Sequence, residues 1–273
     1  MGEYRGGVDS RAHDQWSQAH GGIDPHASAW VSGWVRLTHR CAAPLARRGV
    51  PPDVVTLTGL ALSVPVPVLA GLPGAWPLAA TLLLVVSALV DGLDGAVAAQ
   101  QGSSSAWGEV LDPLADRCSD LLALLALVVL GAPVWLCVAV GALTLLHESV
   151  RSSARAAGLD GIGALTVWER PSRVIVASFV TGLSGLLWCA RELGLGWWPG
   201  LDRAALATGG TVLAAVLAAV GFAHLSTAVR RRLRGQGSGR THQSRDDPSR
   251  EQHQGEPSAG VRGAADQEQS GDR

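Results

Sequence analysis

The stretch LVDGLDGAVAAQQGSSSAWGEVLDPLADRCSD, residues 89–120, decides how the rest of the chain is understood. It begins at the end of a strongly apolar segment, and a second apolar segment follows it directly. It nevertheless contains five aspartates: Asp91, Asp94, Asp112, Asp116 and Asp120. Because a carboxylate beside lipid is costly, acids in such a place are expected to serve a function.

The apolar residues of the 273-residue chain are gathered in long blocks, although only 47% of all residues are hydrophobic and 16% are charged. Each block has about 20 residues, which is enough to cross the hydrocarbon core of a bilayer. A soluble helical bundle would need alternating polar faces, and tracts such as 121–130 and 211–220 lack them. The first tract starts too late for a signal peptide. The pattern predicts an all-α, multi-pass membrane protein.

Six transmembrane helices are predicted, preceded by an amphipathic helix on the membrane surface. The surface helix is expected over residues 27–48, where tryptophans and valines alternate with arginines at helical spacing. An ordinary soluble helix is the alternative there. The six apolar tracts lie near residues 54–72, 76–98, 111–130, 133–150, 174–190 and 204–227.

The two ends of the chain differ in composition from this membrane domain, which is expected to cover residues 27–228. Residues 1–26 are polar and Gly-rich, and residues 229–273 consist mainly of Gly, Ser, Gln, Asp and Arg. Such segments lack the apolar residues needed for a core, so both are predicted to be disordered.

The arginines are distributed unevenly along the chain. They are dense before the first tract, in the connection 151–173 and at 230–234, whereas the opposite side has only Arg191 and Arg203. Under the positive-inside rule, this bias places both termini on the cytoplasmic side of the cell membrane. Residues 89–120 are expected on that side too.

Composition also excludes several kinds of chemistry. All 22 basic residues are arginine, which rules out a P-loop lysine and a lysine Schiff base. The net charge of −1 gives no global field for nucleic acid. The four cysteines form no CxxC pair, so they are expected to be small buried apolar residues.

The spacing of four of the aspartates predicts two acidic helix faces. Asp91 and Asp94 are three residues apart, and Asp112 and Asp116 are four apart, so each pair shares one face of a helix. Small residues beside them, such as Gly92 and Gly108, keep the helices thin enough for the two faces to meet. Acids that are merely solvated at the ends of helices are the alternative.

A shared acidic cavity would need positive charge, since several unpaired carboxylates repel one another. Hard oxygen ligands favour Mg²⁺, Mn²⁺ or Ca²⁺ over zinc. Two such ions about 3.5–4 Å apart suit displacement at phosphorus. The carboxylate that is bound least tightly to metal can then accept a proton from the attacking hydroxyl.

The aspartates and the small residues between them resemble the signature of the CDP-alcohol phosphatidyltransferases. The matching order is Asp91-x2-Asp94-Gly95-x2-Ala98-x9-Gly108-x3-Asp112-x3-Asp116. The resemblance implies transfer of a phosphatidyl-type group from a CDP-activated lipid to an alcohol, with release of CMP. It implies that the four aspartates bind two Mg²⁺ or Mn²⁺ ions, that Asp116 is the base, and that Gly95, Ala98 and Gly108 lie against the CDP moiety.

Two positions depart from this family pattern. The family has arginine directly after the motif alanine, where this chain has Ala99. It often has Pro-Asn before the first span, where this chain has Pro52-Asp53. Asp53 can still accept hydrogen bonds from a cytosine amine, and it is placed with Thr56 in the CDP site. The missing arginine leaves a weakened or inactive relative as an alternative.

The connection SVRSSARAAGLDGIGALTVWERPSRVI, residues 149–175, predicts a phosphate-binding site. Arg155, Arg170 and Arg173 are expected to converge there, since arginine binds phosphate in a bidentate manner. The segment resembles the actinobacterial phosphatidylinositol phosphate and phosphatidylglycerophosphate synthase branch of the family. The resemblance implies a phosphorylated acceptor, inositol phosphate or glycerol phosphate. Simple positive-inside anchoring is the alternative.

Three other polar residues lie near these motifs. His147 and Glu148 form an expected interfacial pair, with a proton relay or an extra ligand as the alternative. Arg117 follows Asp116, which it can orient, or it can anchor the chain at the cytoplasmic surface.

An integral-membrane transferase of phospholipid synthesis is therefore the leading hypothesis. Its expected partners are a CDP-lipid such as CDP-diacylglycerol, a small alcohol and membrane lipids, without nucleic acid. The family resemblance also implies a homodimer. A cation transporter is the alternative from another class, but it requires acids in further spans, and tracts one, five and six have almost none.

Overall fold

The computed structural model describes residues 29–159, 165–195 and 200–243, and all regular structure in these ranges is helical. The segments predicted to be disordered lie largely outside the described residues, at 1–28 and 244–273. The described residues divide into a compact unit that ends at Arg230 and a second unit that begins at Arg231. The core and the candidate site belong to the first unit.

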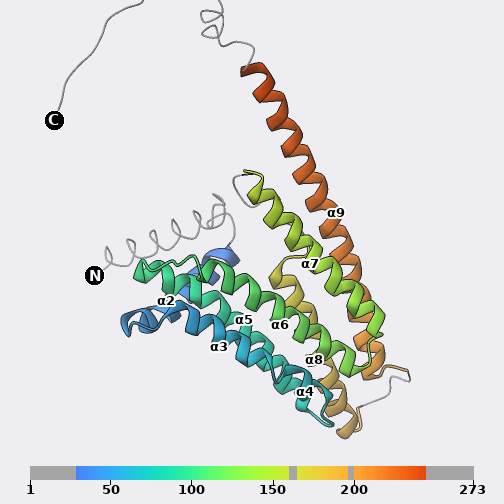
Figure 1. The fold of residues 1–273 in the computed structure, drawn as a ribbon. Helices are drawn as coiled ribbons and strands as arrows, with labels where there is room; N and C mark the ends of the chain where they lie inside the picture. Colours follow the sequence, from blue (N-terminus) through green and yellow to red (C-terminus); the bar gives the residue numbers. More distant parts are fainter. Residues whose placement is uncertain (1–28, 160–164, 196–199, 244–273) are drawn as a thin grey trace, which may run out of the picture. The chain divides into compact units, whose positions relative to one another are not determined.

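Eight helices follow one another in the described residues (Figure 1). They are α2 (Ala29–Arg47), α3 (Pro52–Ser63), α4 (Val66–Gly71), α5 (Trp76–Gln101), α6 (Gly108–Leu130), α7 (Val134–Ala156), α8 (Arg170–Glu192) and α9 (Arg203–Gln243). Each predicted tract corresponds to helix. The predicted surface segment 27–48 corresponds to α2, and α9 continues past the predicted domain boundary at 228.

The first tract is two helices rather than one. Helix α3 ends at Ser63 and α4 begins at Val66, with Pro65 between them. Pro65 has no backbone N–H for the helix ladder, so the run of hydrogen bonds is interrupted there even though Val64 keeps helical dihedral angles. Together α3 and α4 still form one apolar segment, Pro52–Gly71, that is long enough to cross a membrane.

Five helical segments among the described residues are long and apolar enough to span a bilayer. They are Pro52–Gly71, Trp76–Gln101, Val134–Ala156, Arg170–Glu192 and Arg203–Arg234. The prediction of an all-helical, multi-pass membrane protein is therefore confirmed at this level. Helix α6 is not among the five, because its first half carries several charged residues and only its second half is continuously apolar.

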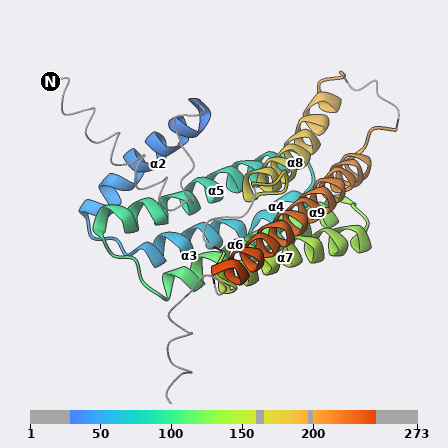
Figure 2. The same cartoon turned by 90° about the horizontal axis from the view of Figure 1, so that it is seen from above.

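Helices α5 and α6 carry the acidic motif, and they share their neighbours. Both pack against α3, α4 and α8, while α2 adds a contact to α5 and α7 adds one to α6 (Figures 1 and 2). Thr56 of α3 and Arg170 of α8 contact the aspartates, whereas α4 packs against the apolar parts of α5 and α6. This arrangement positions the candidate site.

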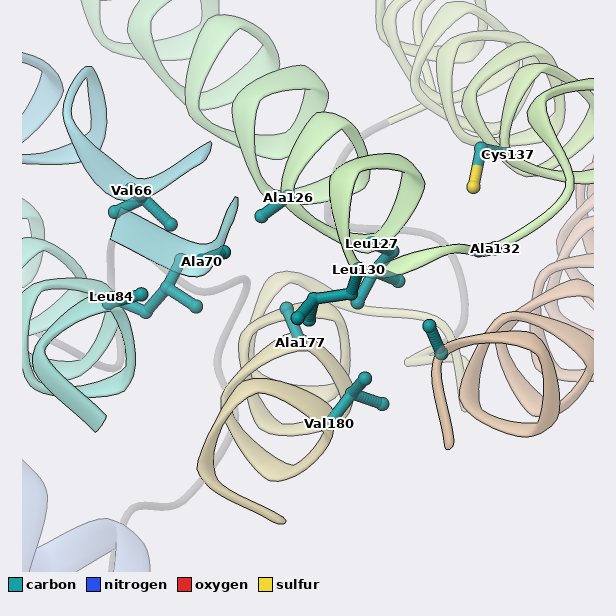
Figure 3. Close-up of a cluster of buried hydrophobic side chains, with 12 residues drawn as sticks. Val66, Ala70, Leu84, Ala126, Leu127, Leu130, Ala132, Cys137, Ala177 and Val180 are labelled. Atoms are coloured by element: carbon teal, nitrogen blue, oxygen red, sulfur yellow. The ribbon is translucent and has the colours of Figure 1, made fainter. Parts of the chain in front are cut away.

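The main apolar cluster fixes α4, α5, α6 and α8 against one another. Figure 3 shows Leu127 and Leu130 of α6 beside Ala177 of α8, with Val66 of α4 in the same cluster. Leu127 is 2% exposed, and full burial of such a side chain is worth roughly 1.5–3 kcal/mol. Because lipid also shields apolar surface, close packing rather than burial alone gives the helices a defined arrangement.

Glycines where helices cross permit this close packing. Two glycines of α8, Gly182 and Gly185, allow a test of their contribution. A Cβ at Gly185 would lie 2.7 Å from Leu78 Cγ and 3.0 Å from the Leu78 backbone nitrogen, whereas a Cβ at Gly182 would meet Thr81 at an ordinary 3.5 Å. We expect Gly185→Ala to lower the free energy of unfolding by about 1–3 kcal/mol through overpacking. The matched control Gly182→Ala should be neutral or slightly stabilising. Thermal unfolding in detergent measures both, and equal stability of the two variants would contradict the crossing geometry.

Candidate metal and nucleotide site

Three of the predicted aspartates meet between α5 and α6. One carboxylate oxygen each from Asp91, Asp112 and Asp116 lie within 4.8 Å of one another. Hard divalent cations bind oxygen at about 2.0–2.6 Å, so two oxygens on one ion can be up to about 4–5 Å apart. The donor set and its spacing therefore fit a divalent cation.

The fourth aspartate, Asp94, is held by α3. Its Oδ2 accepts a hydrogen bond of 2.5 Å from Thr56 Oγ1, and its Oδ1 accepts one of 2.6 Å from the Gly95 amide. The side chain is buried, as is Thr56. Thr56, which the sequence assigned to the nucleotide site, thus contacts Asp94 directly.

Small residues bring α3 close to α5 at the level of Asp91. A Cβ at Gly59 would lie 3.5 Å from the Asp91 backbone nitrogen. Ser87 Oγ donates to the Gly59 carbonyl oxygen at 2.8 Å, and the Ser63 and Ser87 hydroxyls are 2.7 Å apart. The sequence analysis missed these supports. The spacing of Gly59 and Ser63, four residues apart on one helix face, is the signal that could have revealed them.

Two of the predicted CDP-binding residues, Asp53 and Gly108, lie next to each other. A Cβ at Gly108 would lie 3.4 Å from Asp53 Oδ1, so the start of α6 adjoins the start of α3. A Cβ at Gly95 would meet nothing within 4 Å. The open space at Gly95 leaves room for a ligand to approach the backbone, and Ala98 lies half-buried one turn further on.

Two glutamines in the neutral stretch after Ala98 connect the end of α5 to other parts of the chain. Gln100 Nε2 donates to the His39 carbonyl oxygen at 2.9 Å, and Gln101 Nε2 donates to the Val50 carbonyl oxygen at 2.9 Å. These bonds tie the end of α5 to α2 and to the chain that follows it. Ala99 itself is exposed.

Arg170, the first residue of α8, lies among the carboxylates. Its Nη2 is 2.8 Å from Asp91 Oδ1, and its Nη1 contacts Asp116 Oδ1. The start of a helix carries partial positive charge, and the first turn of α8 has no acid of its own. The aspartates of α5 and α6 therefore supply the negative charge that Arg170 needs.

The other two predicted phosphate ligands lie elsewhere. Arg155, in the last turn of α7, is exposed. Arg173 is buried and pairs with Asp120 of α6 at 2.6 Å and with Glu148 of α7 at 2.5 Å. Of the three arginines, Arg170 is the one that the structure brings to the metal-ligand candidates.

The segment before α8 is tied to α7 by a second ion pair. Arg151 binds Glu169 with both terminal nitrogens, at 2.8 Å and 2.6 Å. Burial raises the pKa of Glu169, but the hydrogen bonds from Arg151 and from the Thr166 amide outweigh it and hold the pKa below its ordinary value. His147 is fully buried, with Nε2 3.1 Å from Thr166 Oγ1. These contacts place the start of α8.

Comparisons with known proteins agree with the helices and with the acidic motif. Residues 50–164 match the family model of CDP-alcohol phosphatidyltransferase. The phosphatidylinositol phosphate synthase of Mycolicibacterium smegmatis is 31% identical over 167 residues, which cover 57% of this chain and 72% of that protein. The archaetidylinositol phosphate synthase of Aeropyrum pernix is 32% identical over 153 residues, which cover 55% of this chain and 75% of that protein.

Solved structures show the same similarity. The crystal structure of Mycobacterium tuberculosis phosphatidylinositol phosphate synthase with CDP-DAG bound is 26% identical, with a TM-score of 0.56, covering 71% of this chain and 94% of that one. A second structure of that enzyme, in complex with manganese and citrate, has the same TM-score of 0.56 and 26% identity, and covers 70% of this chain and 88% of that one. The chain belongs to the CDP-alcohol phosphatidyltransferase family. It is an integral-membrane transferase of this type, which acts in phospholipid synthesis.

Proposed function

We propose that the chain transfers a phosphatidyl group from CDP-diacylglycerol, or a related CDP-lipid, to a small phosphorylated alcohol and releases CMP. Inositol phosphate and glycerol 3-phosphate are the proposed acceptors. The observation that carries the proposal is the meeting of the Asp91, Asp112 and Asp116 oxygens within 4.8 Å in a chain of this family. The names of the similar synthases favour inositol phosphate.

The proposed cofactors are two divalent cations, Mg²⁺ or Mn²⁺, held by Asp91, Asp94, Asp112 and Asp116. When bound, such ions polarise phosphoryl oxygens and neutralise charge on the leaving group. The manganese in the similar mycobacterial structure supports this choice of ion. Thr56 would fix the orientation of Asp94 through their hydrogen bond.

Asp116 is the proposed base. The acceptor oxygen attacks the phosphorus that carries the lipid, a new P–O bond forms, and the bond to the CMP oxygen breaks. The Asp116 carboxylate takes the proton from the attacking hydroxyl. Its side chain is 27% exposed and contacts Arg170, so it is both accessible and oriented.

The remaining predicted residues complete the proposed substrate sites. Gly95, Ala98, Gly108, Asp53 and Thr56 would line the CDP site, which the open space at Gly95 and the contact between Gly108 and Asp53 support. Arg155, Arg170 and Arg173 are the arginines assigned by sequence to the acceptor phosphate. Their positions support Arg170 best, because it lies beside the proposed base.

The proposed membrane arrangement has six spans, with α6 as the one added to the five apolar segments. Helix α2 would lie on the membrane surface. The uneven distribution of arginines supports a cytoplasmic location, at the cell membrane, for the acidic motif and for both flanks of the 27–228 membrane domain. Disorder of residues 1–26 and of the segment after α9, and a homodimer, are further parts of the proposal.

Acceptor comparison tests the proposed function. Purified protein with CDP-diacylglycerol and Mn²⁺ is given inositol phosphate or glycerol 3-phosphate, with free inositol and free glycerol as matched controls. We expect CMP release with a phosphorylated acceptor to exceed that with its free alcohol by at least about 100-fold, because a site built for a polar group rejects the analogue that lacks it. Equal rates with the free alcohols would contradict a phosphate-binding site. The absence of CMP with every acceptor would favour the weakened or inactive relative that Ala99 suggests.

A further inference from the structure

A closed group of charges lies where α6, α7 and α8 meet. Arg173 of α8 binds Asp120 of α6 and Glu148 of α7, at 2.6 Å and 2.5 Å, and we name these three residues the α8 clamp. Arg117 of α6 adds a longer contact of 3.8 Å to the second oxygen of Glu148. Two arginines thus face two carboxylates, and the charges within the group balance.

Both terminal nitrogens of Arg173 already donate hydrogen bonds to protein oxygens, so few of its N–H groups remain for a substrate phosphate. Its Nη1 donates to Asp120, while its Nη2 donates to Glu148 and, at 3.5 Å, to the Trp168 carbonyl oxygen. The side chain is 8% exposed. A phosphate would have to displace one of the two carboxylates and then lie beside its negative charge.

The space beside Arg173 is also too small for a phosphate. The adjoining cavity measures about 20 Å³ and is lined by Asp120, Thr144, Trp168, Arg173 and apolar residues. A volume of about 10–15 Å³ already suffices for one water molecule, whereas a phosphate is a phosphorus atom surrounded by oxygens. The cavity can hold a water beside the buried Arg173 Nε, which has no protein partner.

Arg170 also contacts two carboxylates, but it is more exposed than Arg173 and its partners are candidate metal ligands. It lies three residues earlier on the same face of α8, its side chain is 20% exposed, and it faces Asp91 and Asp116. Its surroundings have an excess of carboxylates, since Asp91 and Asp116 both contact this one guanidinium and Asp112 lies beside them. Its position depends on where α8 begins, and the α8 clamp contributes to that position together with the pair of Arg151 and Glu169.

We infer that Arg173 is a positioning residue and not a phosphate ligand. Bound by Asp120 and Glu148, it holds the first turn of α8 so that Arg170 reaches Asp91 and Asp116. The expected effect on turnover rests on the proposed function. The contacts of Arg173 with Asp120 and Glu148 do not depend on that function. It also assigns a role to Asp120, the one aspartate of residues 89–120 that the family signature leaves out.

Variants of Asp120 and Glu148 distinguish a positioning role of Arg173 from a phosphate-binding role, because they leave Arg173 itself unchanged. In Asp120→Asn and Glu148→Gln, a loosened α8 should misplace Arg170 and lower kcat/KM for the acceptor by up to about 100-fold, the cost of a displacement near 1 Å. If Arg173 bound the acceptor phosphate, freeing it from a carboxylate would leave the acceptor KM unchanged or lower it. That result would overturn the inference.

Two controls complete the kinetic test. Asp202→Asn makes the same acid-to-amide change at the start of α9, where Asp202 caps the helix through a 2.7 Å bond from the Ala205 amide. It should retain wild-type kinetics. Glu148→Asp keeps the carboxylate and should recover part of the activity lost in Glu148→Gln, whereas a Glu148→Asp protein no better than Glu148→Gln would count against the clamp.

A double-mutant cycle on stability tests the contact without any substrate. Thermal unfolding in detergent is measured for Arg173→Gln, Glu148→Gln and the double variant. Because Arg173→Gln already breaks the pair with Glu148 as well as the pair with Asp120, the double variant should be little less stable than Arg173→Gln alone. Additive losses would overturn the clamp. A wild-type protein that released no CMP would instead refute the proposed function and leave this cycle valid.

Discussion

Asp116→Asn is expected to abolish CMP release while the protein remains folded. The amide cannot accept the proton of the attacking hydroxyl, and it removes one of the three carboxylate oxygens that meet within 4.8 Å. Positioned proton transfer contributes about 10²–10⁴-fold to rate, so the loss of a base that is also a ligand should exceed about 10³-fold. The measurement is CMP release from CDP-diacylglycerol at saturating acceptor and Mn²⁺.

The matched control for this variant lies on the same helix. Glu109 is exposed in the first turn of α6 and belongs to none of the proposed ligand sets. Glu109→Gln should therefore turn over like wild type. If Asp116→Asn did the same, with an unchanged unfolding temperature, the proposed role of Asp116 as base would be wrong.

Asp91→Asn and Asp112→Asn are expected to weaken Mn²⁺ binding strongly. Removal of a partner that merely orients a metal ligand already costs about 10–100-fold in affinity or activity, so loss of a charged ligand should cost at least about 100-fold. Titration followed by the electron paramagnetic resonance signal of free Mn²⁺ measures this affinity without any substrate. A chelator should abolish turnover of the wild-type protein, and added Mn²⁺ should restore it.

Asp53→Asn is the control for the metal variants. Asp53 adjoins Gly108 at the start of α6, near the three clustered acids, but its proposed role is in the CDP site. Its amide variant carries the residue that the family often has at this position, so it should bind Mn²⁺ within a few-fold of wild type and retain its affinity for the CDP-lipid. Equal Mn²⁺ affinities in Asp53→Asn, Asp91→Asn and Asp112→Asn would show that the acidic cluster is not the metal site.

Hydropathy predicted which parts of the chain are helical, and it predicted some helix ends, such as the start of α5 at Trp76 and the end of α6 at Leu130, but not others. Helix α7 runs to Ala156 and α8 starts at Arg170, so much of the expected connection 151–173 is helix. Polar residues at the ends of a span can continue the helix through backbone hydrogen bonds. A search for apolar residues does not detect such extensions. The break at Pro65 was likewise missed, because both sides of it are apolar.

The site was predictable to the extent that its residues are close in sequence. The spacing of Asp112 and Asp116 placed them on one helix face, and the structure brings Asp91 to them from α5. The contacts of Asp94 with Thr56 and of Arg173 with Asp120 join helices far apart in the chain. Such pairings depend on how the helices pack, which the spacing within one helix does not determine.

The stoichiometry of one reaction tests directly whether this protein transfers a phosphatidyl group. Purified wild-type protein with Mn²⁺, labelled CDP-diacylglycerol and inositol phosphate should release one CMP for each labelled lipid that becomes joined to the acceptor, and none without acceptor. Glycerol 3-phosphate is run in parallel. Release of CMP without acceptor, or a labelled lipid product that forms equally well in Asp116→Asn, would contradict metal-assisted phosphatidyl transfer at this site.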